Sequence, residues 1–255
     1  MIFPTTFSQR LLRKGPLVED TYQLFASWDF ALSVPENLQR GFAGRYRSLG
    51  WEKEVTTTVG SRLRSFSRMK ALVVLASNGM SLLDWRDCWR LWISACEQPF
   101  GTFARGWLYD EFLSGRYNIR TEDVVETAAA SWHERAGNKP ISDYGVLRAA
   151  RDLLKTAADL GMLNTKGAVK TFAHPTMSDE VFLFYVHQIA ELEGNYARVP
   201  GSPLWRAAFM SPEDVQRVLL RLHQYRKLDY QVAGSIQQLT LPHHSAIEYA
   251  ESIME

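Results

Sequence analysis

Hydrophobic residues recur at helical spacing through most of the first half of the chain. The spacing predicts an amphipathic helix in residues 15–32 and a longer helix in residues 56–77, separated by the Pro and Gly residues of 35–50. Ser81 has the position of an N-cap that opens a Trp-rich helix, and helical periodicity continues to about residue 112. The first half is therefore predicted to form a helical bundle.

The second half of the chain contains four polar residues that are typical helix starts. They are Thr121, Ser142, Ser178 and Ser211, and the last is followed by Pro at the first helical position. Residues 228–242 instead alternate around a Gly-Ser turn, which predicts a β-hairpin. The second half is therefore predicted to combine helices with a short hairpin.

The order of these elements indicates a type of domain. Helix, short helix, helix and hairpin follow one another over 179–242, which is the order of a winged helix-turn-helix. A helix followed by an extended segment occurs at both 142–175 and 211–241, which indicates either two related winged-helix-like units or a coincidence. We expect a mainly α fold, with a basic N-terminal helical domain in residues 1–115 and a helical, winged-helix-like domain in residues 116–255.

The composition is that of a globular protein. With 255 residues and 46% hydrophobic content, the chain can bury a sizeable core. Its longest apolar stretch, residues 71–76, is far shorter than the roughly 18 residues that a membrane helix needs, and the N-terminus does not have the pattern of a secretory signal. Cys88 and Cys96 have a spacing that matches neither a zinc motif nor a disulfide framework. We therefore expect a cytoplasmic protein without membrane association.

The sequence contains none of the common catalytic motifs. A phosphate-binding loop, a dinucleotide-binding turn, a zinc-protease helix and a nucleophile elbow are all absent. Glu52 and Lys53 resemble the end of a metal-dependent nuclease motif, but no Asp on a preceding strand supports that distant alternative. The six histidines are scattered, and they are His133, His174, His187, His223, His243 and His244. We expect no enzyme activity, no cofactor and no metal site.

Three tryptophans lie at helical spacing in the Trp-rich helix. Trp85, Trp89 and Trp92 could stack nucleobases. With Leu82 and Leu91 nearby, however, they have the pattern of a buried helix face. We predict that they pack in the core.

Positive charge concentrates near the N-terminus. Residues 1–70 carry eleven Lys and Arg residues against six Asp and Glu residues, although the net charge of the whole chain is only +1. Within this stretch the cations are interspersed with Ser and Thr, which also contact phosphate well. The pattern favours DNA binding. The contacts that we expect there are Arg62, Arg64 and Arg68 first, followed by Arg45 and Arg47.

Arg64 and Arg68 lie four residues apart, which places them on one face of the predicted helix. A phosphate strand could follow that face. The alternative is an ordinary solvated helix exterior, in which the arginines form ion pairs with Glu52 or Glu54. Both interpretations stay open at this point.

A second candidate DNA site lies in the C-terminal half. Arg217 and Arg221 fall on the predicted recognition helix of residues 212–227. The surrounding region, 179–214, is acidic, and winged helices serve for protein contacts about as readily as for DNA. This helix is therefore predicted to hold either DNA or a partner protein.

Three segments carry a resemblance to a known family. They are KGPLVEDTYQLFASW, SDYGVLRAARDLLKTAADLGML and SPLWRAAFMSPEDVQRVLLRLHQYRKLDYQVAGSIQQLTLPHHSAIEYAE. The last is the most specific, with Trp-Arg before a helix, Ser-Pro-Glu-Asp-Val at its start and Ala-Gly-Ser before the final strand. On these segments the chain resembles the BrxA family of BREX bacteriophage-exclusion systems.

The resemblance implies a small accessory component of a multi-protein defence system, with winged-helix character and similar to DNA-binding proteins rather than to enzymes. Double-stranded DNA and other BREX components are the implied partners. We therefore expect a non-enzymatic, DNA-binding accessory component. The alternative is an interaction scaffold that holds another defence subunit without touching nucleic acid, which the acidic region 179–214 favours.

Overall fold

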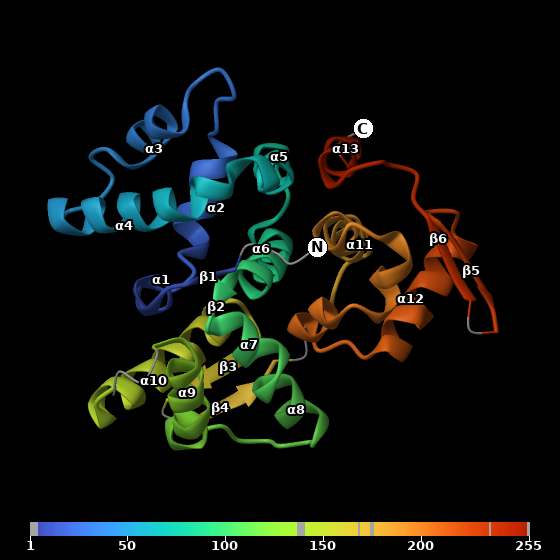
Figure 1. Ribbon diagram of the computed structural model, residues 1–255. Coiled ribbons are helices and arrows are strands. Elements are labelled where there is room, and N and C mark those ends of the chain that lie inside the picture. Colours follow the sequence, from blue (N-terminus) through green and yellow to red (C-terminus); the bar gives the residue numbers. More distant parts are fainter. Residues whose placement is uncertain (1–4, 137–140, 168, 174–175, 235, 254–255) are drawn as a thin grey trace.

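Helices form most of the chain, as Figure 1 shows. Within the described residues, short strands pair in three two-stranded sheets. This computed structural model describes residues 5–136, 141–167, 169–173, 176–234 and 236–253. The predicted mainly α fold is confirmed.

The N-terminal region consists of helices joined by short connections. Strand β1 (Thr6–Phe7) pairs in parallel with β2 (Glu97–Gln98). The helices are α1 (Gln9–Lys14), α2 (Val18–Ala26), α3 (Val34–Phe42), α4 (Leu49–Arg62), the 3₁₀ helix η1 (Leu63–Arg68), α5 (Lys70–Ser77), α6 (Leu82–Cys96), α7 (Phe100–Arg105) and α8 (Trp107–Leu113).

Two of the predicted helices have different bounds in the structure. The helix predicted for 15–32 begins only at Val18, because Leu17 adopts a left-handed backbone with a φ of 47°. The helix predicted for 56–77 is divided into the end of α4, the 3₁₀ helix η1 and α5. Within η1, Ser65 leaves helical geometry with φ −103° and ψ 32°. The chain therefore turns at the point where the sequence pattern indicated one continuous helix.

The Trp-rich helix α6 has the predicted start and the predicted burial. The Ser81 hydroxyl accepts a hydrogen bond from the Asp84 backbone N–H at 3.1 Å, which caps the helix. Trp85, Trp89 and Trp92 are all buried, and the rings of Trp85 and Trp89 stack with 5.5 Å between their centroids. These tryptophans belong to the core, as the helical spacing predicted.

The middle of the chain is a helix pair followed by a hairpin. Helix α9 (Thr121–Ala136) packs on α10 (Asp143–Asp159), and β3 (Leu163–Lys166) pairs antiparallel with β4 (Val169–Phe172). Ile119 forms a β-bridge with Lys170 of β4, so a third extended segment lies beside the hairpin. The extended segment that the sequence predicted after α10 is thus one strand of a hairpin.

The C-terminal region repeats the order of helices followed by a hairpin. Its elements are α11 (Asp179–Glu193), η2 (Tyr196–Gly201), η3 (Pro203–Ala208), α12 (Pro212–Gln224), β5 (Asp229–Ala233), β6 (Ile236–Thr240) and α13 (Ala246–Ser252). Strands β5 and β6 form the predicted hairpin, although Ser235 at its turn lies outside the described residues. Helix α12 ends before the predicted Lys227, because Arg226 is left-handed with a φ of 58°.

One hydrophobic core joins these regions. A single cluster of buried hydrophobic residues has members from Leu12 near the N-terminus to Ala250 near the C-terminus. Helix α11, which is buried along most of its length, packs on α6 and α13, and α13 packs on α5. The predicted boundary between residues 115 and 116 falls in the connection between α8 and Ile119, and the core is shared across it.

Candidate nucleic-acid interface

Arg62, the first of the predicted DNA contacts, is buried inside the protein. Only 6% of the residue is exposed. Its Nε donates to Glu97 Oε1 at 2.6 Å, and its Nη2 donates to the Gly15 carbonyl at 2.8 Å. The expectation that Arg62 is an exposed DNA contact is therefore wrong, because its guanidinium is already paired with a carboxylate and a backbone carbonyl in the interior.

Arg64 and Arg68 are exposed, but they do not share one face of an α-helix. Both lie on η1, which has about three residues per turn, and Ser65 between them departs from helical geometry. The described residues provide neither arginine with a side-chain hydrogen bond or an ion pair. They remain available to a phosphate as individual cations.

Arg45 and Arg47 lie at the opposite end of α4 from Arg64. Helix α4 has 14 residues, so about 20 Å separates its ends. Arg45 hydrogen-bonds Gln23, lies 3.9 Å from Asp20 and covers the ring of Tyr46, whereas Arg47 is exposed. The predicted basic stretch is thus divided between two places on the surface.

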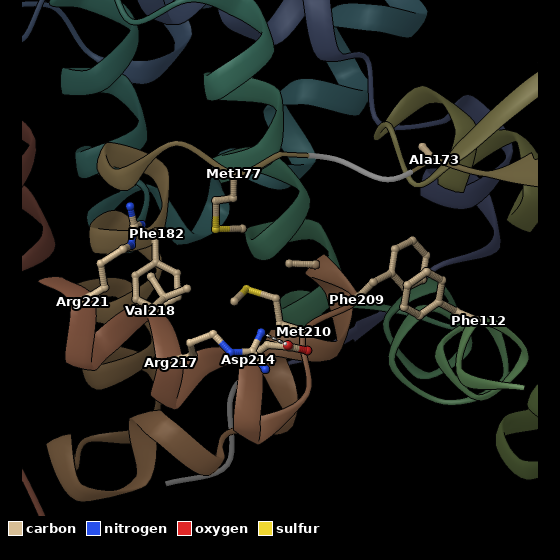
Figure 2. A pocket seen from close by; sticks show the side chains of 11 residues that line it. Phe112, Ala173, Met177, Phe182, Phe209, Met210, Asp214, Arg217, Val218 and Arg221 are labelled. Atoms are coloured by element: carbon tan, nitrogen blue, oxygen red, sulfur yellow. Dashed lines mark hydrogen bonds and ion pairs between the residues drawn. The ribbon is translucent and has the colours of Figure 1, made fainter. Parts of the chain in front are cut away.

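Arg217 and Arg221 project from α12 and are both paired with acids. Arg217 Nη1 lies 3.1 Å from Asp214 Oδ1 (Figure 2). Arg221 forms an ion pair with Asp179, the first residue of α11. The pKa of Asp214 is lowered by its hydrogen bonds with Ser211 and by Arg217, against the opposing effect of burial. Asp214 is therefore ionised at neutral pH and offsets the charge of Arg217.

A further group of cations, which the sequence analysis did not single out as a site, lies on α1 and α10. Helices α1 and α10 pack against each other, and a groove of about 460 Å³ lies beside them. Arg10, Arg13 and Lys14 of α1 line it together with Arg148 of α10.

One face of α10 carries most of the cations on its side of the groove. Tyr144, Arg148, Arg151 and Lys155 follow one another at spacings of four, three and four residues, which places them on one face of the helix. Arg13, Arg148 and Arg151 have no side-chain hydrogen bond or ion pair with the described residues. This face therefore presents guanidinium groups whose donors face solvent.

Three carboxylates lie among these cations. Glu54 pairs with Arg10 at 3.0 Å and with Lys14 at 3.3 Å, and hydrogen bonds from Lys14 and then Arg10 lower its pKa. Lys155 pairs with Asp159 at 3.1 Å.

The third carboxylate, Asp152, lies among several cations. Burial raises the pKa of Asp152, while Arg148, Lys155 and Arg13 act in the opposite direction. A fourth carboxylate, Asp143, is the first residue of α10. Against the six cations on α1 and α10, the four carboxylates leave an excess of two positive charges.

A second, smaller groove lies on the other flank of α1 and extends the basic surface. Its volume is about 240 Å³, and Arg10, Ser61, Arg64 and Ser65 are among its lining residues. Because Arg10 lines both grooves, α1 lies between α10 and η1. We call the combined face of α10, α1 and η1 the α1–α10 surface.

Buried contacts hold α1 in this position. Arg62 and Trp89 donate to the backbone carbonyls of Gly15 and Pro16, at 2.8 Å and 3.0 Å respectively. Gly15 has a φ of 77°, and a Cβ there would lie only 3.3 Å from Lys155 Nζ. Glycine at this position thus allows the end of α1 to approach α10. Arg62 holds the end of α1 in place through its hydrogen bond to the Gly15 carbonyl.

The histidines and cysteines do not form a metal site in the described part of the chain. No group of three or more His, Cys, Asp or Glu residues there has the geometry to hold a metal ion. Burial raises the pKa of the Cys96 thiol to about 12, and it also raises the pKa of the Cys88 thiol well above its ordinary value. Both thiols are therefore protonated at neutral pH. His174 and the side chain of His133 lie outside the described residues.

Comparison with known proteins gives no relative. No family model matches the chain, and no curated protein or solved structure matches it. Among the described helices, none is both long and apolar enough to cross a membrane.

Proposed function

We propose that this protein binds double-stranded DNA through the α1–α10 surface and has no catalytic activity of its own. The observation that carries the proposal is the excess of two positive charges on α1 and α10, where Arg13, Arg148 and Arg151 have no ion pair with any described residue. Cations with uncommitted donors are the groups that replace counterions on a phosphate backbone. The resemblance to the BrxA family supports the same function, and we propose membership of that family and a role in a BREX defence system.

The element order around α10 supports a double-stranded partner. Ile119, α9, α10 and the β3–β4 hairpin follow the order of a winged helix-turn-helix, in which the second helix enters the major groove. Helix α10 occupies the place of that recognition helix, and Tyr144, Arg148 and Arg151 are on its exposed face. This order supports α10, in the middle of the chain, as the proposed reading helix rather than α12.

The binding mode follows from the chemistry of the surface. Arginine side chains on α1, α10 and η1 meet phosphates regardless of sequence, so affinity falls steeply with salt and sequence preference is weak. The direct test is a fluorescence-anisotropy titration of two unrelated 20-base-pair duplexes with the full chain at low and moderate salt. Binding of both duplexes that weakens strongly with salt supports the proposal. Absence of binding at low salt overturns it.

The second candidate is an interaction scaffold that holds another defence subunit. The C-terminal region favours it, because Arg217 and Arg221 of α12 are each paired with a carboxylate and because the region exposes large apolar residues: Leu220 at 44%, Tyr225 at 66% and Val232 at 46%. Co-purification of a defence component from the native operon, unchanged by nuclease treatment and lost on Tyr225→Ala substitution, supports the scaffold. A chain that purifies without a partner from the same cells counts against it.

A further inference from the structure

A hollow separate from the α1–α10 surface lies between side chains of α12, such as Arg217, Val218 and Arg221, and Met177 (Figure 2). Its volume is about 310 Å³, which is within the range of small-molecule sites. Met177, Phe182, Phe209, Met210 and Val218 form most of its wall. Two methionines facing aromatic rings give a wall that adapts to apolar ligands of different shape.

Phe209, one wall of this hollow, is held in a strained conformation. Its φ of 56° is left-handed, a region that bulky residues rarely occupy. The ring stacks on Phe112 with 4.5 Å between centroids and meets Phe172 edge-on at 5.4 Å. Strain of this kind, of order 1–3 kcal/mol, concentrates at ligand sites. The wall is therefore fixed by contacts with α8 and β4 before any ligand arrives.

Two arginines stand at the edge of the apolar hollow. Arg217 and Arg221 lie one helical turn apart on α12, and both line it together with Asp214. A guanidinium has five N–H donors. Each arginine has one ion pair among the described residues, with Asp214 or Asp179, so donors remain on both. Asp214 in the lining and Asp179 beside it offset the charges of the two arginines, so a ligand is received by their remaining N–H donors rather than by an excess of charge.

We propose that this hollow binds a small monocarboxylate with an apolar body. The carboxylate is received by Arg217 and Arg221, and the apolar body lies between Met177, Phe182 and Met210. Arginine suits this role because its planar donors match the two oxygens of a carboxylate. A cationic amphiphile has no matching acceptor here beyond Asp214, which Arg217 already holds.

The test is an isothermal titration of the full chain with sodium decanoate below its micelle concentration. Decyltrimethylammonium, which has a chain of the same length and the opposite charge, is the control ligand. We expect saturable binding of decanoate at one site and none of decyltrimethylammonium. No DNA is present, so the result is independent of the proposed DNA binding. Absence of saturable decanoate binding, or equal binding of both compounds, overturns the proposal.

Three variants locate the site. Arg217→Ala/Arg221→Ala removes the carboxylate donors and is expected to weaken decanoate binding at least tenfold, and Val218→Trp fills the hollow and is expected to abolish binding. Arg226→Ala, on an exposed arginine outside the hollow, leaves binding unchanged. Both substituted arginines of the pair are exposed, so that variant keeps the fold and decides the question even if Val218→Trp does not fold. Binding that the arginine pair variant leaves unchanged contradicts the assignment.

Discussion

Helices α10 and α12 each carry two exposed or half-exposed arginines, and they differ in what lies beside them. On α10, Arg148 and Arg151 have no ion pair with any described residue, and Arg148 lines a groove together with cations of α1. On α12, Arg217 and Arg221 are each paired with a carboxylate. The number of arginines on a helix therefore says little about the electrostatic potential around that helix. The charges that folding brings alongside decide how much uncompensated positive charge a phosphate meets there.

The largest expected effect concerns the anchor of the α1–α10 surface. Arg62→Ala leaves the Glu97 carboxylate buried without its partner. Breaking a buried pair in this way costs about 3–5 kcal/mol of unfolding free energy. Urea unfolding followed by circular dichroism measures it. Arg64→Ala, two residues away and exposed, is the control and stays within about 0.5 kcal/mol of wild type. Equal stability of the two variants contradicts the anchoring role.

The next effect compares the two helices directly. Replacing Arg13, Arg148 and Arg151 by Ala is expected to reduce DNA affinity at least about a hundredfold, because a charged hydrogen bond contributes about 1.5 kcal/mol or more. The matched variant replaces Arg217, Arg221 and Arg226, which changes the net charge equally. Anisotropy titrations at one salt concentration measure both. A larger loss in the matched variant would move the DNA site to α12.

A smaller effect is the pH dependence of stability, which arises from His187 in the C-terminal region and not from the α1–α10 surface. Burial lowers the pKa of His187 in α11 to about 4, with a smaller contribution from His243. In the unfolded chain His187 binds a proton near pH 6.5, whereas in the folded chain it stays neutral until the pH approaches 4. The free energy of unfolding therefore falls as the pH drops below about 6.5. Arginines stay ionised throughout this range, so the charge of the α1–α10 surface does not change.

His187→Phe keeps a ring that can stack on Tyr249, which His187 contacts at 4.8 Å. Between pH 7.5 and pH 6.0 we expect wild type to lose about 1 kcal/mol more unfolding free energy than the variant. Urea unfolding at the two pH values measures the difference. The same pH dependence in both proteins refutes this account of His187.

The smallest effect tests the carboxylate within the α1–α10 surface. Asp152 lies among Arg13, Arg148 and Lys155. Asp152→Asn removes a charge that repels phosphate, and we expect DNA affinity to rise about threefold. Asp229→Asn, on β5 in the C-terminal region, is the control and leaves affinity unchanged. Equal affinities of wild type and Asp152→Asn would place the DNA elsewhere.

Local signals in the sequence predicted most helices and the C-terminal hairpin. Ser81, Ser142 and Ser211 cap helices as expected, because a cap depends on residues three positions apart. The break at Ser65 and the left-handed Leu17 gave no such signal, since packing of distant segments imposes them. The sequence pattern therefore predicted which helices and strands exist better than it predicted where each one begins and ends.

The candidate site was less predictable than the fold. The burial of Arg62 depends on Glu97, which is 35 residues away, so no local pattern reveals it. The stripe of Tyr144, Arg148, Arg151 and Lys155 was visible in the sequence, because it is the polar face of a helix whose apolar face was recognised. What the sequence could not show is that α1 lies beside that stripe.

The most direct test of DNA binding at the α1–α10 surface is the salt dependence of the affinity. Each phosphate contact contributes about 0.9 to the slope of log affinity against log salt. The variant lacking Arg13, Arg148 and Arg151 is therefore predicted to have a slope smaller than that of wild type by about three units. The variant lacking Arg217, Arg221 and Arg226 is predicted to keep the wild-type slope. Equal slopes for wild type and the first variant would contradict the assignment of the DNA site.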